Sequence, residues 1–139
     1  MKKLIAFIML ALAFPTLHAT SRSQQEKASE ELVLNNGAKW KIDQATGNNV
    51  AYLQQIAKKV KGHKLADYHQ AGTRLQAGID QMIKECRMRG ADHLALHKWL
   101  EPLMEQVNQL KQATNTASAK SHFSKVKKRL TLFNQYFKV

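Results

Sequence analysis

The chain has 139 residues, a single cysteine and a formal net charge of +12. This length predicts one domain with one hydrophobic core, and a lone cysteine excludes an intramolecular disulfide. The excess of basic side chains favours anionic partners, such as a lipid surface, a polyanionic polysaccharide or nucleic acid.

The first 19 residues have the pattern of a secretory signal peptide. Lys2 and Lys3 form a basic start, residues 4–14 are apolar, and Leu17-His18-Ala19 is an acceptable cleavage site. An apolar run of 11 residues is too short to span a bilayer, which needs about 20. Cleavage would leave 120 residues with 20 basic and 10 acidic side chains. We therefore expect a periplasmic or secreted protein, and export makes nucleic acid a poor candidate partner.

Two short segments precede the part of the chain with helical periodicity. Residues 20–31 are polar without an apolar period, which predicts a flexible leader before a single domain at residues 32–139. Asn36-Gly37 then lies between two short apolar runs. This dipeptide is a strong β-hairpin signal, because both central residues of a type I′ turn need positive φ. We expect a short hairpin or extended segment here.

From Asn48 onward the apolar residues recur at the spacing of amphipathic helices. Four inward-facing stripes are expected: Val50, Leu53, Ile56, Ala57 and Val60; Leu65, Tyr68, Gly72, Leu75, Ile79, Met82 and Cys86; His93, Leu96, Leu100, Leu103, Val107 and Leu110; and Phe123, Val126, Leu130, Phe133 and Phe137. Four such helices joined by short links predict an all-α, antiparallel up-down-up-down four-helix bundle. A three-helix domain with a loosely docked first helix is the alternative.

Local signals predict the helix ends. Gly90 is expected to stop the second helix in the left-handed region, while Asp92 and Ser118 are expected to cap the third and fourth. Pro102 lies inside the third helix. A bend is expected there, with the carbonyl of Lys98 released from helical hydrogen bonding.

One cluster of residues indicates chemistry: Cys86, Met88, His93 and His97. If the second and third helices form a hairpin near Gly90, a rise of about 1.5 Å per residue places Cys86 level with the gap between the two histidines. Positions 93 and 97 are one helical turn apart, so both imidazoles can face the same way. The sequence therefore predicts a metal site at one end of the bundle.

The ligand types favour a soft metal ion. Thiolate with thioether selects Cu(I), whereas thiolate with imidazole also suits Zn(II). With Met88 engaged copper is favoured, and with Asp92 in its place zinc is favoured. The alternative is structural, because a buried free cysteine is a common small hydrophobe. Four aromatic side chains are expected to cover the site: Trp40, Phe133, Tyr136 and Phe137.

Two motifs together resemble those of a known group of proteins. The segment Leu34-Asn-Asn-Gly-Ala-Lys-Trp40, followed by Cys86-x-Met88-x-Gly90-x-x-His93-x-x-Leu96-His97, resembles a group of small secreted bacterial four-helix-bundle proteins. The resemblance spans about residues 34–136. It implies a secreted bundle whose Cys, Met and His act as a unit, and it supplies no substrate.

The layout also looks like that of periplasmic bundle cytochromes, but haem is not expected. The chain has no C-x-x-C-H attachment motif, and the fourth helix has only His122, at the opposite end from Cys86. His63 and His69 are expected at that opposite end too.

A non-catalytic interaction module is the alternative function. Two basic runs from neighbouring helices would meet an anionic envelope surface: Lys58, Lys59, Lys61 and Lys64, and Lys125, Lys127, Lys128 and Arg129. An enzyme is not expected, since the sequence has no nucleophile turn, oxyanion motif or acidic pair at useful spacing.

Overall fold

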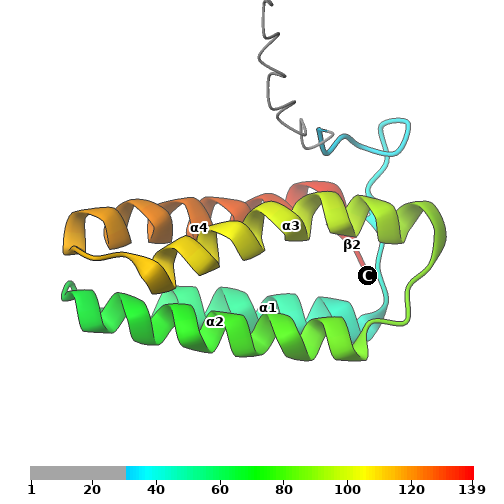
Figure 1. The fold of residues 1–139 in the computed structure, drawn as a ribbon. Helices are drawn as coiled ribbons and strands as arrows, with labels where there is room; N and C mark the ends of the chain where they lie inside the picture. Colours follow the sequence, from blue (N-terminus) through cyan, green and yellow to red (C-terminus); the bar gives the residue numbers. More distant parts are fainter. Residues whose placement is uncertain (1–30) are drawn as a thin grey trace, which may run out of the picture.

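Residues 31–139 are described by a computed structural model, and they form a four-helix bundle with two short strands (Figure 1). The elements are β1 (Trp40–Lys41), α1 (Gln44–Lys59), α2 (Leu65–Glu85), α3 (Gly90–Gln112), α4 (Thr116–Tyr136) and β2 (Phe137–Lys138). The predicted four-helix bundle is confirmed. The predicted signal peptide at residues 1–19 and nearly all of the predicted leader lie outside the described residues.

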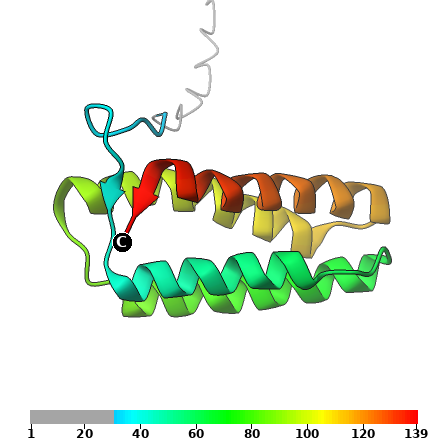
Figure 2. The same ribbon diagram turned by 180° about the vertical axis from the view of Figure 1, so that it is seen from behind.

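The connectors between successive helices lie at alternate ends of the bundle, so each helix runs back along the previous one (Figures 1 and 2). The beginning of α1, the connector from α2 to α3 and the end of α4 share one end. The connectors from α1 to α2 and from α3 to α4 share the other. Within residues 31–139, no helix combines the length and apolar character needed to cross a membrane.

The core follows the stripes predicted from the sequence. Leu53, Leu75, Leu103 and Val126 are completely buried, one from each helix, which is the expected result of apolar residues recurring along one helix face. The stripe of α3 also contains Trp99, a residue absent from the predicted set and one of the fully buried side chains. Its ring packs edge-on against Phe133, with ring centroids 4.8 Å apart, and Phe133 stacks on Phe137.

Three predicted helix ends are wrong. α2 ends at Glu85 rather than at Gly90, which instead begins α3 with a φ of 71°. Asp92 lies in the first turn of α3 and does not cap it. The cap of α4 is Asn115, whose side chain accepts a hydrogen bond from the Ser118 N–H.

The N-terminal arm contains the predicted turn but not a full hairpin. Asn36 and Gly37 have φ values of 49° and 85°, and Asn35 and Ala38 exchange both backbone hydrogen bonds across them. The pairing stops there. β1 instead pairs in parallel with β2, with Trp40 opposite Phe137. The two ends of the domain are therefore held side by side.

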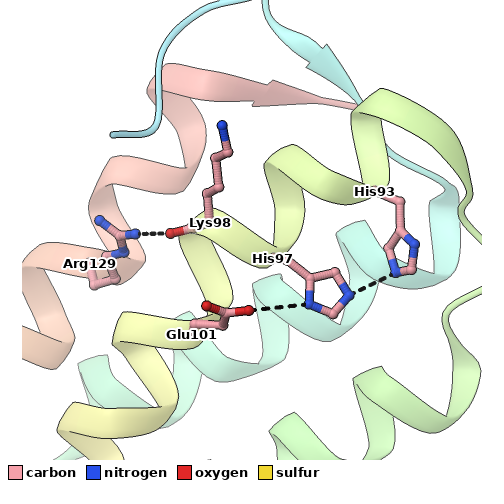
Figure 3. A network of polar contacts seen from close by, with 5 residues as sticks. All are labelled: His93, His97, Lys98, Glu101 and Arg129. Atoms are coloured by element: carbon pink, nitrogen blue, oxygen red, sulfur yellow. Dashed lines mark hydrogen bonds and ion pairs between the residues drawn. The ribbon is translucent and has the colours of Figure 1, made fainter. Parts of the chain in front are cut away.

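The proline in α3 has a specific partner in α4. Because Pro102 has no N–H, the Lys98 carbonyl lacks its helical donor, as predicted. The Arg129 guanidinium donates to this carbonyl (Figure 3) and also to the Trp99 carbonyl, at 2.9 Å. The Trp99 indole N–H in turn donates to the Arg129 carbonyl at 2.8 Å. Desolvation lowers the pKa of this half-buried Arg129 from its usual value.

Replacing Arg129 by Gln is expected to lower the free energy of unfolding by about 2 kcal/mol, because hydrogen bonds to a charged donor are lost. In a Pro102→Ala background the restored N–H can serve the Lys98 carbonyl, so the same replacement should cost less. Denaturant unfolding of the two single variants and the double variant measures this coupling. Additive losses would show that Arg129 does not compensate for the proline.

Candidate metal centre

The candidate site lies on the connector Cys86–Arg89 between α2 and α3. Cys86 ends α2 in an extended conformation, with ψ of 125°, while its N–H still bonds to the Met82 carbonyl at 2.9 Å. Because the helix has already ended, Met88 turns back toward the core and is partly buried against it. The Met88 sulfur accepts a hydrogen bond from the hydroxyl of Thr46, at 3.6 Å. Both sulfur-bearing side chains are thus half-buried at this end of the bundle.

Two aspartates fix this end of the bundle by accepting backbone hydrogen bonds from distant segments. Asp43 caps α1 through a 2.7 Å bond from the Thr46 N–H and also accepts from the Arg87 N–H on the connector, at 3.4 Å. Asp92 accepts a 2.9 Å bond from the Lys41 N–H in β1. This bond engages one Asp92 oxygen, which counts against Asp92 replacing Met88 as a ligand.

The Asp43 carboxylate is stabilised in its charged form. Burial alone would raise the pKa of Asp43, but hydrogen bonds from Thr46 and from the Arg87 backbone, together with the nearby Arg87 charge, hold the pKa below its usual value. The sequence analysis missed this residue. An aspartate three positions before Thr46 at the start of a helical segment was the available signal.

His93 and His97 face each other on α3, as their spacing predicts (Figure 3). Their Nε2 atoms are 3.1 Å apart, and the rings meet edge to face with centroids 4.6 Å apart. Two nitrogens bound to one tetrahedral Zn(II), at about 2.0–2.1 Å each, would lie about 3.3 Å apart. The pair is therefore close to the separation that one ion requires.

Glu101 continues the row of polar side chains one turn further along α3 (Figure 3). Its carboxylate lies 3.8 Å from Nδ1 of His97, which is an ion-pair distance and too long for a hydrogen bond. A carboxylate on this side favours a proton on Nδ1 and leaves Nε2 as the ligand atom. Both side chains are well exposed, at 49% for His97 and 69% for Glu101.

The structure brings three of the four predicted ligands to one place and leaves the fourth outside it. An open depression of about 550 Å³ is lined by Cys86, Met88 and His93, together with Arg87 and Arg89. His97 is not part of its lining. Within residues 31–139, no group of three or more His, Cys, Asp or Glu side chains lies close enough to hold a metal ion. The two arginine charges also act against a cation in the depression.

The aromatic residues expected to cover the site lie elsewhere. Trp40 donates its indole N–H to the Val33 carbonyl at 2.7 Å and lines a separate apolar pocket with Leu32 and Leu94. Phe133 and Phe137 pack on Trp99 in the core. None of these residues lines the depression at Cys86, so the candidate site is open to solvent.

The remaining histidines of the bundle have separate partners. His69 contacts the Ala113 carbonyl through Nε2, at 2.8 Å, and His122 contacts the Gln106 side chain through Nδ1, at 3.0 Å. His63 is exposed in the connector before α2. These contacts place His69 and His122 away from Cys86.

No family model matches this chain, and no curated protein or solved structure matches it. The resemblance to small secreted bacterial four-helix-bundle proteins therefore stays a prediction.

Removing the Asp43 carboxylate is expected to loosen this end of the bundle. Asp43→Ala should lower the free energy of unfolding by about 1 kcal/mol, the usual effect of losing an N-cap. Because the folded-state pKa is lowered, this contribution is present above the unfolded value of about 3.9 and is lost as the pH falls through the folded value. Denaturant unfolding at pH 7 and at pH 3 measures the difference.

Asp80→Ala is the matched control, since Asp80 is exposed in the middle of α2 and its carboxylate accepts a hydrogen bond from the Gln76 side chain one turn away, not from another segment of residues 31–139. An equal loss of stability in both variants would contradict a special role for Asp43.

Proposed function

We propose that this protein is an exported, non-catalytic metal-binding protein that takes one Cu(I) or Zn(II) ion at the α2–α3 end of the bundle. His93 and His97 would supply two nitrogen ligands, Cys86 the thiolate and Met88 a thioether where the ion is copper. The signal peptide expected from the sequence supports export. The proposal includes no haem and no other cofactor.

The separation of the two imidazoles carries the proposal. Two ring nitrogens 3.1 Å apart on an exposed helix face resemble half of a metal site. In the apo protein one ring can donate its Nε2–H to Nε2 of the other; in the metal-bound protein both Nε2 atoms would bind the ion, and the donor ring would carry its proton on Nδ1 instead. Both residues lie on one regular helix, and their spacing of four residues places the two rings next to each other. Little rearrangement of His93 and His97 is then needed for binding.

The sulfur ligand requires a local movement. Cys86 lines the same depression as His93, and it lies where α2 gives way to an extended connector. A change of the Cys86 rotamer, with a small shift of the connector, would bring the thiolate toward the histidine pair. Binding would be pH-dependent, because the thiol and any protonated imidazole must lose protons to the solvent.

Met88 distinguishes the two ions. A thioether is a ligand for soft Cu(I) but a poor one for Zn(II). The contact between the Met88 sulfur and the Thr46 hydroxyl is weak and can be exchanged for a metal bond. We therefore expect Met88 to participate in copper binding and to be dispensable for zinc.

Titration with Zn(II) under reducing conditions, and with Cu(I) under anaerobic conditions, should give one ion per chain for at least one metal. Cys86→Ala and the double variant His93→Ala/His97→Ala should each lose that binding. Met88→Leu should weaken Cu(I) binding while leaving Zn(II) binding unchanged. Glu101→Gln is expected to weaken binding by about tenfold, as outer-shell carboxylates do.

The double variant His63→Ala/His122→Ala is the matched control, since it removes two imidazoles elsewhere in the chain. Unchanged metal content in the Cys86 and His93/His97 variants, or equal loss in the control, would refute the proposed site.

A basic interaction surface is the second candidate function. Lys58 of α1 and Lys127 of α4 line one groove, whose floor includes Ala57 and Leu130, so the two basic runs do meet across neighbouring helices. Arg129, which the sequence analysis included in this surface, instead bonds to carbonyls of α3. The candidate surface therefore consists of lysines alone.

Reversing three of these charges tests this second function. In the triple variant Lys125→Glu/Lys127→Glu/Lys128→Glu, retention on phosphatidylglycerol vesicles should fall strongly, and wild-type retention should weaken steeply with salt. If retention is unaltered in the variant, these lysines only keep the protein soluble and do not form a binding surface.

A further inference from the structure

A small polar pocket lies at the opposite end of the bundle from Cys86, where α1 passes into α2. It is lined by Lys59 from the end of α1, Lys61 from the connector, and Gln70 and Arg74 from the second and third turns of α2. Its apolar wall includes Ile56 and Ala71, both buried in the core. The pocket therefore combines a rigid wall with several hydrogen-bond donors.

The three cationic side chains of this pocket are not paired with an acidic side chain in the described part of the chain. Within residues 31–139, neither Lys59, Lys61 nor Arg74 forms an ion pair or a side-chain hydrogen bond. The one acidic group in the lining, Asp67, is already engaged, because its carboxylate accepts a 3.0 Å bond from the Lys64 N–H. Three cations and one anion leave the lining with a net charge of +2.

The connector is held tightly at this position. A Cβ at Gly62 would overlap the Asp67 carboxylate, so a larger residue here would have to displace the Asp67 side chain. The hydrogen bond between Asp67 and the Lys64 N–H then fixes the first turn of α2 against the connector. As a result Lys61 is carried by backbone that is anchored on both sides of Gly62.

The size of the pocket limits its ligand. Its volume is about 130 Å³, well below the roughly 300–1,000 Å³ of sites for drug-sized molecules. A volume of this size suits a single small ion with its nearest waters. A net charge of +2, supplied by one guanidinium and two ammonium groups, is complementary to a dianion, and Arg in particular binds oxyanions through paired N–H donors.

We infer that this pocket binds a tetrahedral oxyanion, either inorganic phosphate or sulfate, or the phosphomonoester of a larger molecule. Arg74 and Gln70 project from a regular helix and would bind the oxygens with directed N–H donors. Lys59, at the end of α1, and Lys61, in the connector, would add charge. The site is separate from the histidine pair, so it does not depend on the proposed metal function.

Calorimetric titration of the full chain with inorganic phosphate at low ionic strength tests this inference. Saturable binding of one phosphate per chain is expected, with sodium sulfate competing. In the double variant Lys61→Gln/Arg74→Gln the affinity should fall by about tenfold or more, since hydrogen bonds between charged partners are lost.

Lys111→Gln/Lys120→Gln is the charge-matched control. Both lysines are exposed, on α3 and α4, and lie outside the pocket lining, so phosphate affinity should stay within about twofold of wild type. Equal weakening in both double variants, or no saturable binding to the wild type, would overturn the inference. If the pocket variant is unfolded by circular dichroism, Lys59→Gln alone should still weaken phosphate binding, and an unchanged affinity would overturn the inference.

A second experiment distinguishes a lipid headgroup from free phosphate as the source of the anion. Sedimentation with phosphatidylcholine vesicles that contain phosphatidate is compared for the wild type and for Lys61→Gln/Arg74→Gln. Vesicle binding that is lost in the variant identifies a lipid headgroup as the source. Vesicle binding that does not differ, with phosphate binding still lost in the variant, identifies free phosphate.

Discussion

The end of the bundle that carries the candidate metal site depends on two aspartates that bond to backbone rather than to cations. Asp43 joins the start of α1 to the connector before α3, and Asp92 joins the start of α3 to β1. These carboxylates lie near the surface at this end of the bundle and connect four chain segments: β1, the start of α1, the connector and the start of α3. They bring Met88 against Thr46 and hold the connector on which Cys86 lies. Without these bonds the helices would still pack through their apolar core, but the connector would be held less firmly.

Much of the fold could be predicted because it depends on local patterns. The apolar stripes predicted the buried faces, Asn36-Gly37 predicted a turn with both φ values positive, and Pro102 predicted that the Lys98 carbonyl would lack its helical donor. The partner of that carbonyl could not be predicted. Arg129 lies 31 residues further along the chain, and only the packing register of α3 against α4 brings it there. From the sequence alone it was indistinguishable from the neighbouring exposed lysines.

The candidate site, too, could be predicted where it depends on one helix but not where it depends on the packing between helices. The pair His93 and His97 follows from the geometry of one helix, so its spacing alone predicted that the rings would face each other. Placing Cys86 required the path of the connector between two helices, and α2 proved to end at Glu85, five positions before the expected stop at Gly90. The connector is therefore longer and more open than predicted. The structure brings Cys86 and Met88 beside His93 but leaves His97 outside their depression.

The most direct test of the metal site is X-ray absorption at the zinc edge of protein loaded with one Zn(II) ion per chain. A site made by the histidine pair and Cys86 predicts two imidazole nitrogens at about 2.0–2.1 Å and one sulfur at about 2.3 Å. Cys86→Ala should retain no zinc, so both the sulfur and the imidazole scattering should be lost. A spectrum with oxygen neighbours alone, or one that is identical in Cys86→Ala, would contradict the proposed coordination.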